Sequence, residues 1–300
     1  MSYHEPVLAE ECIEALAIQP AGIYVDATFG GGGHSTLILN ELSDNGRLLG
    51  FDQDEDAMSN IPDNASFTFV HHNFRYLKRF LKLHGIKGVD GILADLGVSS
   101  HQLDEKERGF SHRFDSQLDM RMNQQGDQTA ADVLNSYDAA SLQQVFSQYG
   151  EVRNARTLAL KIVESRANQP LETIGQFLDL IDPLVRGQKH RYLSQVFQAL
   201  RIEVNDEMGA LKDFLSQTLE VLKPGGRLVV ISYHSIEDRI VKNFLRAGNV
   251  EGTINKDFYG NIEKPFKLIS RKALLPSPEE IKRNPRSRSA KLRIGEKQNN

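Results

Sequence analysis

The residues best suited to chemistry lie in one short stretch, GIYVDATFGGGGH at 22–34. Asp26 follows three β-prone residues, and the glycines after it form a turn without side chains, so a ligand can approach the backbone closely. The run STLILNEL after His34 predicts a helix that opens with Ser35. Strand, glycine turn and helix form the nucleotide-binding unit of doubly wound α/β folds. A tight flexible turn gives the same pattern, and Asp26 could instead cap that turn.

Two further acids strengthen the nucleotide-binding interpretation. The segment RLLGFDQD predicts a second strand that ends at Asp52, nineteen residues after Gly33. An acid at that distance can accept hydrogen bonds from both ribose hydroxyls. Asp95 ends a fourth predicted strand, and Phe74, just after the third, is placed to contact a base. Since ligands lie outside the carboxyl ends of parallel strands, the three acids are expected on one rim.

Alternating strands and helices must position this rim. Such alternation predicts a parallel sheet with right-handed crossovers. The predicted strands are 22–27, 47–52, 66–71 and 90–95, with helices at 35–43, 55–60 and 74–84. From about Leu103 to Asn205 no strand is predicted, and helical periodicity dominates instead. The helices expected there are 129–135, 139–148, 151–167, 172–186 and 192–204.

The α/β pattern then resumes. A long helix at 208–222, a KPGG turn and the strand RLVVISY precede two alternating segments, 266–274 and 290–296, which predict an antiparallel edge pair. The polar segment 276–289 between them predicts a surface loop. We therefore expect a discontinuous α/β domain, 1–104 with 206–300, interrupted by an inserted helical domain, 105–205.

Composition narrows the class of protein. The single Cys12 excludes an intramolecular disulfide and a cysteine metal cluster, and no metal site is predicted. The single Cys12 fits a reducing cytoplasm, so we expect a cytoplasmic protein. Neither a signal peptide nor a membrane span is predicted, so no membrane partner is expected. From Lys264 onward, eleven Lys/Arg face three acids, a net charge of +8, whereas the first 263 residues carry −12 (25 minus 37). A basic tail on an acidic body favours a polyanionic partner, although a solvated tail has the same composition.

The glycine loop argues against nicotinamide binding. That fold needs GxGxxG with a third glycine packed on the helix, whereas this loop reads FGGGGHS. The crowded loop, the acid after strand two and LKPGGRLVV before a late strand resemble S-adenosylmethionine-dependent methyltransferases instead.

Nearly the whole chain resembles the bacterial RsmH (MraW) family. The matching stretches are HEPVLAEE at 4–11, DATFGGGGHS at 26–35, DLGVSSHQLDEKERGFS at 95–111, LDMRM at 118–122, FQALRIEVNDE at 197–207, LKPGGRLVVISYHSIEDRIVK at 222–242 and NPRSRSAKLR at 284–293. Two departures are Gly31 and His101, where the family commonly has Arg and Pro.

The resemblance implies a Rossmann-like sheet, the cofactor S-adenosyl-L-methionine, and methylation of the exocyclic N4 of a cytidine in the decoding region of small-subunit (16S) ribosomal RNA. In this sequence Gly32, Gly33 and His34 would hold the methionine end of the cofactor, and Asp52 the ribose. Phe74 would flank the adenine. The residues expected to complete the cofactor pocket are Asp95 and Gln102, beside Asp26 on the same rim.

The proton acceptor for the amine is open at this stage. Many amino-methyltransferases use Asp/Asn-Pro-Pro-aromatic after strand four, but this chain has Asp-Leu-Gly-Val there. The candidates are Asp95, Ser99, Ser100 and His234. The target base must leave its stack, which requires an aromatic platform. The candidates for it are Tyr233, Phe110 and Phe114.

Arginines in the insert and tail suit phosphate binding. Those expected to contact RNA are Arg108, Arg113, Arg121, Arg201, Arg286 and Arg288, although an ordinary solvated helix face is the alternative for each. An exposed insert could also support a homodimer. Two other functions stay open: an RNA- or ribosome-binding assembly factor without activity, and a methyltransferase acting on DNA or a small molecule.

Overall fold

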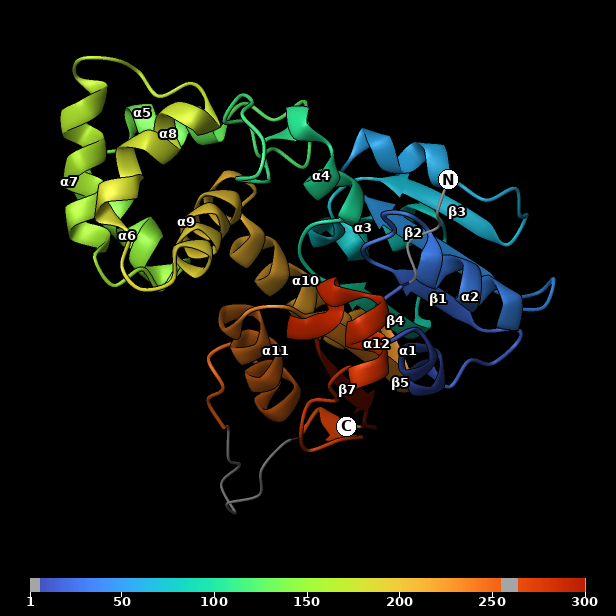
Figure 1. Ribbon diagram of the computed structural model, residues 1–300. Helices are drawn as coiled ribbons and strands as arrows, with labels where there is room; N and C mark the ends of the chain where they lie inside the picture. Colours follow the sequence, from blue (N-terminus) through green and yellow to red (C-terminus); the bar gives the residue numbers. More distant parts are fainter. Residues whose placement is uncertain (1–5, 255–263, 300) are drawn as a thin grey trace. The chain divides into compact units, whose positions relative to one another are not determined.

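The computed structural model describes residues 6–254 and 264–299, and the chain divides into two compact units (Figure 1). The sheet unit comprises Met1–Gly97 with Met208–Asn300, and the helical unit comprises Val98–Glu207. The first five residues, which include the start of the matching stretch HEPVLAEE, lie outside the described residues. Within residues 6–254 and 264–299, none of the helices combines the length and the apolar character needed to cross a membrane.

A seven-stranded sheet in the order β3-β2-β1-β4-β5-β7-β6 forms the centre of the sheet unit. Its strands are β1 Ile23–Asp26, β2 Arg47–Asp52, β3 Phe67–His71, β4 Val89–Asp95, β5 Leu222–Ser232, β6 Phe266–Leu268 and β7 Lys291–Lys297. The first five are parallel, and β7 lies antiparallel between β5 and β6. The predicted doubly wound sheet and its antiparallel edge pair are confirmed.

Alternate residues of each strand face opposite cores. Val25 of β1 and Ile92 of β4 pack into one core, and their neighbours Tyr24 and Leu93 into the other. The first core is covered by α3 Leu77–Leu83, α10 Glu207–Val221 and α11 Ser235–Ala247. The second is covered by α1 Ala9–Leu16 and α2 Gly33–Glu41. Two-sided burial explains the continuous apolar runs of the parallel strands.

The sheet reverses its direction of growth between β1 and β4. The chain leaves β1 through α2, builds β2 and β3 on one side, and returns to β4 on the other side of β1. In open α/β sheets, ligands bind at the carboxyl ends of the strands at this switch point. Asp26 and Asp95 are the last residues of the two strands concerned.

Four local predictions need correction. The KPGG turn is the irregular start of β5, where Gly225 has a φ of +79° and the register with β4 shifts. The predicted helix 55–60 is the 3₁₀ segment η1, and 74–84 begins with the 3₁₀ turn η2 (Phe74–Tyr76) before α3. The surface loop predicted at 276–289 is wrong. It forms α12 (Pro278–Arg283) and η5 (Pro285–Ser289).

A buried hydrogen bond explains why the segment around α12 is ordered. Ser277 caps the helix by accepting from the Glu280 N–H, and the Glu280 carboxylate accepts from the Leu8 N–H at 2.9 Å. Glu280 is thereby only 9% exposed despite its charge. The polar composition of segment 276–289 predicts a loop, because composition does not show a contact with a residue as distant in sequence as Leu8.

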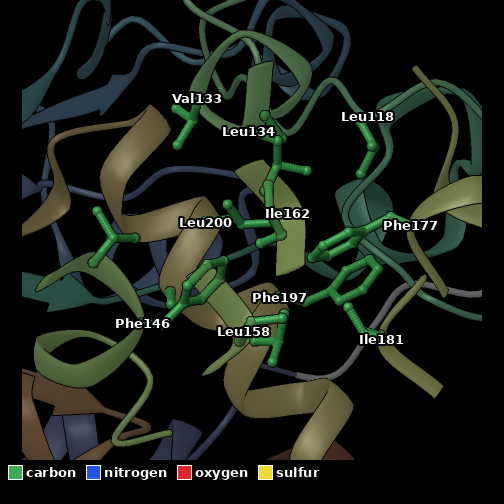
Figure 2. Close-up of a cluster of buried hydrophobic side chains, with 14 of the residues drawn as sticks. Leu118, Val133, Leu134, Phe146, Leu158, Ile162, Phe177, Ile181, Phe197 and Leu200 are labelled. Carbon is green, nitrogen blue, oxygen red and sulfur yellow. The ribbon is translucent and has the colours of Figure 1, made fainter. Parts of the chain in front are cut away.

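The helical unit has its own apolar core. Its helices are α4 Ser100–Asp104, α5 Ala130–Ser136, α6 Ala139–Gln148, α7 Ala155–Arg166, α8 Ile174–Ile181 and α9 Lys189–Val204, with the 3₁₀ turns η3 Lys106–Arg108 and η4 Asp182–Leu184. Figure 2 shows Phe177 and Phe197 beside Ile181, with Leu158 and Ile162 nearby in the same cluster. The five helices predicted between 129 and 204 are confirmed. In the described part of this unit, strand pairing is limited to one isolated bridge, Gln117 with Thr173.

Candidate active site

Asp26 ties the end of β1 to the start of α2. Its carboxylate accepts from the Ser35 hydroxyl at 2.7 Å and from the Thr28 N–H at 3.1 Å, and only 1% of the residue is exposed. Burial raises the pKa of Asp26, while His34 and these hydrogen bonds lower it. These contacts are those of a turn cap. Asp26 therefore stabilises the conformation of the chain around the glycine turn from its buried side.

The glycine turn itself uses backbone conformations that other residues adopt rarely. Gly30 and Gly32 have φ values of +50° and +74°. A Cβ on Gly32 would lie 3.1 Å from the Phe29 ring, whereas a Cβ on Gly31 would meet nothing within 4 Å. The backbone at Gly31 is therefore open to a ligand, and Gly32 at the start of α2 maintains the turn.

Asp52 holds this turn from the neighbouring strand. Its two carboxylate oxygens accept from the Gly30 N–H at 2.7 Å and the Asp54 N–H at 2.9 Å. Each oxygen keeps acceptor capacity for a further donor, as two ribose hydroxyls would require. Burial raises the pKa of Asp52 to about 6, against the opposing effect of these two N–H donors.

Asp95 is held by groups from three segments of the sheet unit. Its backbone N–H donates to Thr28 Oγ1 at 2.7 Å, and the Thr28 hydroxyl in turn interacts with Asp26. Its carboxylate accepts from the Tyr233 hydroxyl at 2.8 Å through Oδ1, and its Oδ2 lies 3.9 Å from His34 Nδ1. The side chain remains 24% exposed. It is therefore oriented and still accessible.

The surroundings of Asp95 raise the pKa of its carboxyl toward neutrality. Burial raises its pKa to about 6, and the charges of Asp26 and Glu237 act in the same direction. His34 and the Tyr233 hydroxyl oppose them. A carboxylate with this pKa can accept a proton without being protonated already at neutral pH.

His34 faces inward and bridges two groups of the sheet unit. Its Nε2 lies 3.0 Å from the Val7 carbonyl, which can only accept, so Nε2 carries the hydrogen. Its Nδ1 side points to Asp95. With 7% of its surface exposed, His34 has little surface left to contact a ligand directly.

His234 is the N-cap of α11. Its Nδ1 accepts from the Glu237 N–H at 3.4 Å, and its Nε2 lies 3.2 Å from Glu237 Oε1. Glu237 in turn accepts from the Tyr233 N–H. The imidazole lone pair is thus engaged in the cap, which makes His234 a weaker base candidate than Asp95. Burial raises the pKa of Tyr233 far above its usual value, so its hydroxyl keeps its hydrogen and donates.

Phe74 lies at the end of the loop after β3. Its ring packs edge-on against Phe214 of α10, with the centroids 5.1 Å apart, and it remains half-buried. The preceding Asn73 caps the turn by accepting from the Arg75 N–H at 2.9 Å. One face of a fixed aromatic ring is compatible with contact to an adenine.

Three further candidates, Ser99, Ser100 and Gln102, lie in the helical unit. Ser99 and Gln102 form a capping box at α4: the Ser99 hydroxyl accepts from the Gln102 N–H, and the Gln102 side chain accepts from the Ser99 N–H. Ser100 is the first residue of that helix. The S-x-x-Q spacing is a recognisable cap signature, which the sequence interpretation did not use.

Several predicted RNA-binding arginines use their donors internally. Arg108 is 8% exposed and donates to the Arg121 and Met122 carbonyls. Arg121 donates to Asp119, and Arg201 makes a two-contact ion pair with Glu207 at 2.7 and 3.0 Å. Each is thus also explained by the fold of the helical unit.

The other arginines and aromatic rings divide by exposure. Arg113 and Arg288 are exposed, whereas Arg286 is half-buried. Phe110 is 6% exposed, which leaves little ring surface for a base. Phe114 is 38% exposed, with the Arg113 guanidinium 5.6 Å from its ring centroid.

The rim fits S-adenosylmethionine, the cofactor that the sequence resemblance implies. The open backbone at Gly31, the free acceptor capacity of Asp52 and the cluster of carboxylates match a ligand with a ribose and positive charges.

Matched alanine substitutions test the role of the turn. Gly32→Ala should destabilise the sheet unit by about 1–2 kcal/mol, the cost of a left-handed residue with a Cβ. It should also weaken cofactor binding, whereas Gly31→Ala should stay near wild type in urea unfolding. Equal loss of stability in both variants would contradict the conformational argument.

A second prediction concerns the pKa of Asp95. The Tyr233 hydroxyl donates to the ionised carboxylate and so lowers its pKa. Tyr233→Phe should therefore raise the pKa of Asp95 above about 6 in a carbon-detected NMR titration. Tyr76→Phe, at an exposed ring, is the control and should leave the titration unchanged. An unaltered Asp95 titration in Tyr233→Phe would show that the hydrogen bond has no such effect.

Comparison with known proteins places the chain in a family. Its sequence matches the MraW methylase family over residues 1–298. It is 59% identical over 297 residues to ribosomal RNA small subunit methyltransferase H of Bacteroides fragilis strain YCH46, covering 99% of this chain and 98% of the relative. The enzyme of the same name from Cytophaga hutchinsonii is 53% identical over 299 residues, covering 99% and 100%. The chain is a methyltransferase that belongs to the MraW methylase family.

Proposed function

We propose that this enzyme transfers a methyl group from S-adenosylmethionine to the exocyclic N4 of a cytidine in the decoding region of 16S ribosomal RNA, within the small ribosomal subunit in the cytoplasm. The observation that carries the proposal is the oriented, accessible carboxylate of Asp95 beside the glycine turn. The names of relatives that match nearly the full chain support a small-subunit RNA substrate.

Methylation of a cytosine amine requires a hydrogen-bond acceptor close to the amine. A cytosine amine is a poor nucleophile because its lone pair is delocalised into the ring. S-adenosylmethionine supplies an electrophilic methyl group. Asp95 would accept a hydrogen bond from the amine, hold the nitrogen so that its lone pair can form, and take the proton that is lost.

Geometry ranks Asp95 first among the proposed catalytic residues. The Tyr233 hydroxyl donates to Oδ1 of Asp95, so Oδ2 is the oxygen that would accept a hydrogen bond from the amine. The Ser99 hydroxyl serves a helix cap, and the His234 ring serves another. Among the described residues, Ser100 has no orienting contact comparable to the hydrogen bond from Tyr233 to Asp95.

We propose that cofactor binding is shared among Asp26, Gly32, Gly33, His34, Asp52, Phe74, Asp95 and Gln102. The described contacts support two kinds of role. Asp52 offers free acceptor capacity for ribose hydroxyls. The glycine turn offers backbone that is open at Gly31 and packed against Phe29 at Gly32 and Pro6 at Gly33. Asp26 and His34 would act indirectly, because each is buried and bonded to neighbouring protein groups.

The helical unit would recognise the RNA. Phe114 and Arg113 support this role, since an exposed ring with a guanidinium beside it can stack on an unpaired base. Arg288 adds an exposed cation from the sheet unit.

The reaction can be tested with small subunits from cells that lack the enzyme. Purified protein and labelled S-adenosylmethionine should place label in the 16S RNA, and nucleoside mass spectrometry should identify N4-methylcytidine. Deproteinised RNA is tested in parallel, which shows whether the enzyme requires the assembled subunit as its substrate. Label on another nucleoside, or on neither substrate with cofactor binding intact, would contradict the proposed specificity.

The role of Asp95 is tested separately by Asp95→Asn. Loss of the proton acceptor should lower the single-turnover rate at saturating cofactor by about 10²–10⁴-fold. Asp44→Asn, which removes the same charge at an exposed position, should leave the rate unchanged. A rate within a few-fold of wild type for Asp95→Asn would assign the proton to another group.

A further inference from the structure

A hollow on the sheet unit lies away from the acid rim. It has a volume of about 320 Å³ and is lined by the end of α11, by β6 and by the chain on either side of it. We call it the basic hollow and define it by its lining residues, which are Leu245, Arg246, Lys264, Phe266, Lys267, Leu268, Arg271 and Gln298. Four of these are cations and none is an acid.

The basic hollow has a fixed framework. β6 is the last strand of the sheet and pairs only with β7 among the described residues. The Gln298 N–H donates to the Pro265 carbonyl at 2.9 Å, and Pro265 packs against Gly248 at the end of α11. Phe266 and Leu245 are almost fully buried beneath it. These contacts fix the base of the basic hollow, formed by Phe266 and Leu245, to the rest of the sheet unit.

Within residues 6–254 and 264–299, protein contacts neutralise these cations only in part. Lys267 lies 3.7 Å from Glu296, a carboxylate that Arg227 already approaches at 2.8 Å. Arg246 donates to a backbone carbonyl, that of Gly252, at 3.0 Å. Lys264 and Arg271 are exposed at the rim. The described lining therefore carries four positive side chains and no negative one, in a chain whose net charge is −4.

The apolar part of the lining narrows the choice of ligand. Leu268 is 38% exposed and offers an apolar surface between the cations. A cationic rim attracts phosphates, and an apolar floor accommodates an unstacked base. A single strand of RNA presents both groups at nucleotide spacing.

We propose that the basic hollow binds a single-stranded segment of the RNA substrate that flanks the target nucleotide. Phosphates would contact Lys264 and Arg271, and a base would lie against Leu268. β6 is three strands from β4, at least about 14 Å away at the usual strand spacing, so this segment contributes to binding and not to the transfer step.

This inference rests on the RNA substrate of the proposed function but not on which atom receives the methyl group. The test measures RNA binding and not methyl transfer. Its result can therefore be interpreted even if the methyl group goes to an atom other than N4. The probe is a fluorescent single-stranded RNA that carries the decoding-region cytidine and its flanks, titrated at several salt concentrations.

The test variant is Lys264→Gln with Arg271→Gln. Loss of two phosphate contacts should reduce the slope of log affinity against log salt by about 1.4, at about 0.7 per contact for a single strand. The matched control, Lys82→Gln with Lys87→Gln, removes the same charge from exposed positions of the same unit and should leave the slope unchanged. Equal slopes in both double variants would overturn the proposal.

Two further measurements separate the alternatives. Leu268→Asp should weaken RNA binding and raise KM for the RNA with kcat unchanged, because the hollow is remote from Asp95. Cytidine monophosphate is the competing probe. If it binds the hollow and the RNA salt slope is insensitive to Lys264 and Arg271, the hollow is a free-nucleotide site and the proposal is wrong.

Discussion

The site depends on three carboxylates that lie together at the carboxyl ends of neighbouring parallel strands. Asp26, Asp52 and Asp95 end neighbouring strands, and their mutual repulsion adds to the cost of burial. Each is stabilised by donors from the protein, and the Thr28 hydroxyl links the Asp26 carboxylate to the backbone N–H of Asp95. The glycine turn supplies one of these donors, the Gly30 N–H, so the backbone conformation and the electrostatics are coupled.

This arrangement suits a positively charged ligand with a ribose. The pKa values of Asp52 and Asp95, both about 6, place the carboxylates close to losing their charge when the site holds no cation. A sulfonium and a pair of ribose hydroxyls would favour the ionised forms. Cofactor binding would then prepare Asp95 to accept a proton from the amine.

The ends of the strands could be predicted because strand periodicity and acid spacing are local properties of the sequence. The partners of the acids could not. The hydroxyl that orients Asp95 belongs to Tyr233, 138 residues away, and was expected only as a stacking platform. Likewise, composition shows the charge of Arg108 and Arg201 but not the carbonyls and carboxylate that engage them. The capping box of Ser99 and Gln102 was readable from spacing, whereas the buried Glu280–Leu8 contact was not.

The most direct test of the central claim is proton release on cofactor binding. Two carboxyls with pKa values of about 6 are each half-protonated at pH 6, so binding that ionises both should release about one proton. Calorimetric titration of S-adenosylmethionine in buffers of different ionisation enthalpy measures this number. We expect release near one proton at pH 6 and almost none at pH 8, with about half of it lost in Asp52→Asn. Proton uptake, or no exchange at pH 6, would contradict the coupling between the acid rim and the cofactor.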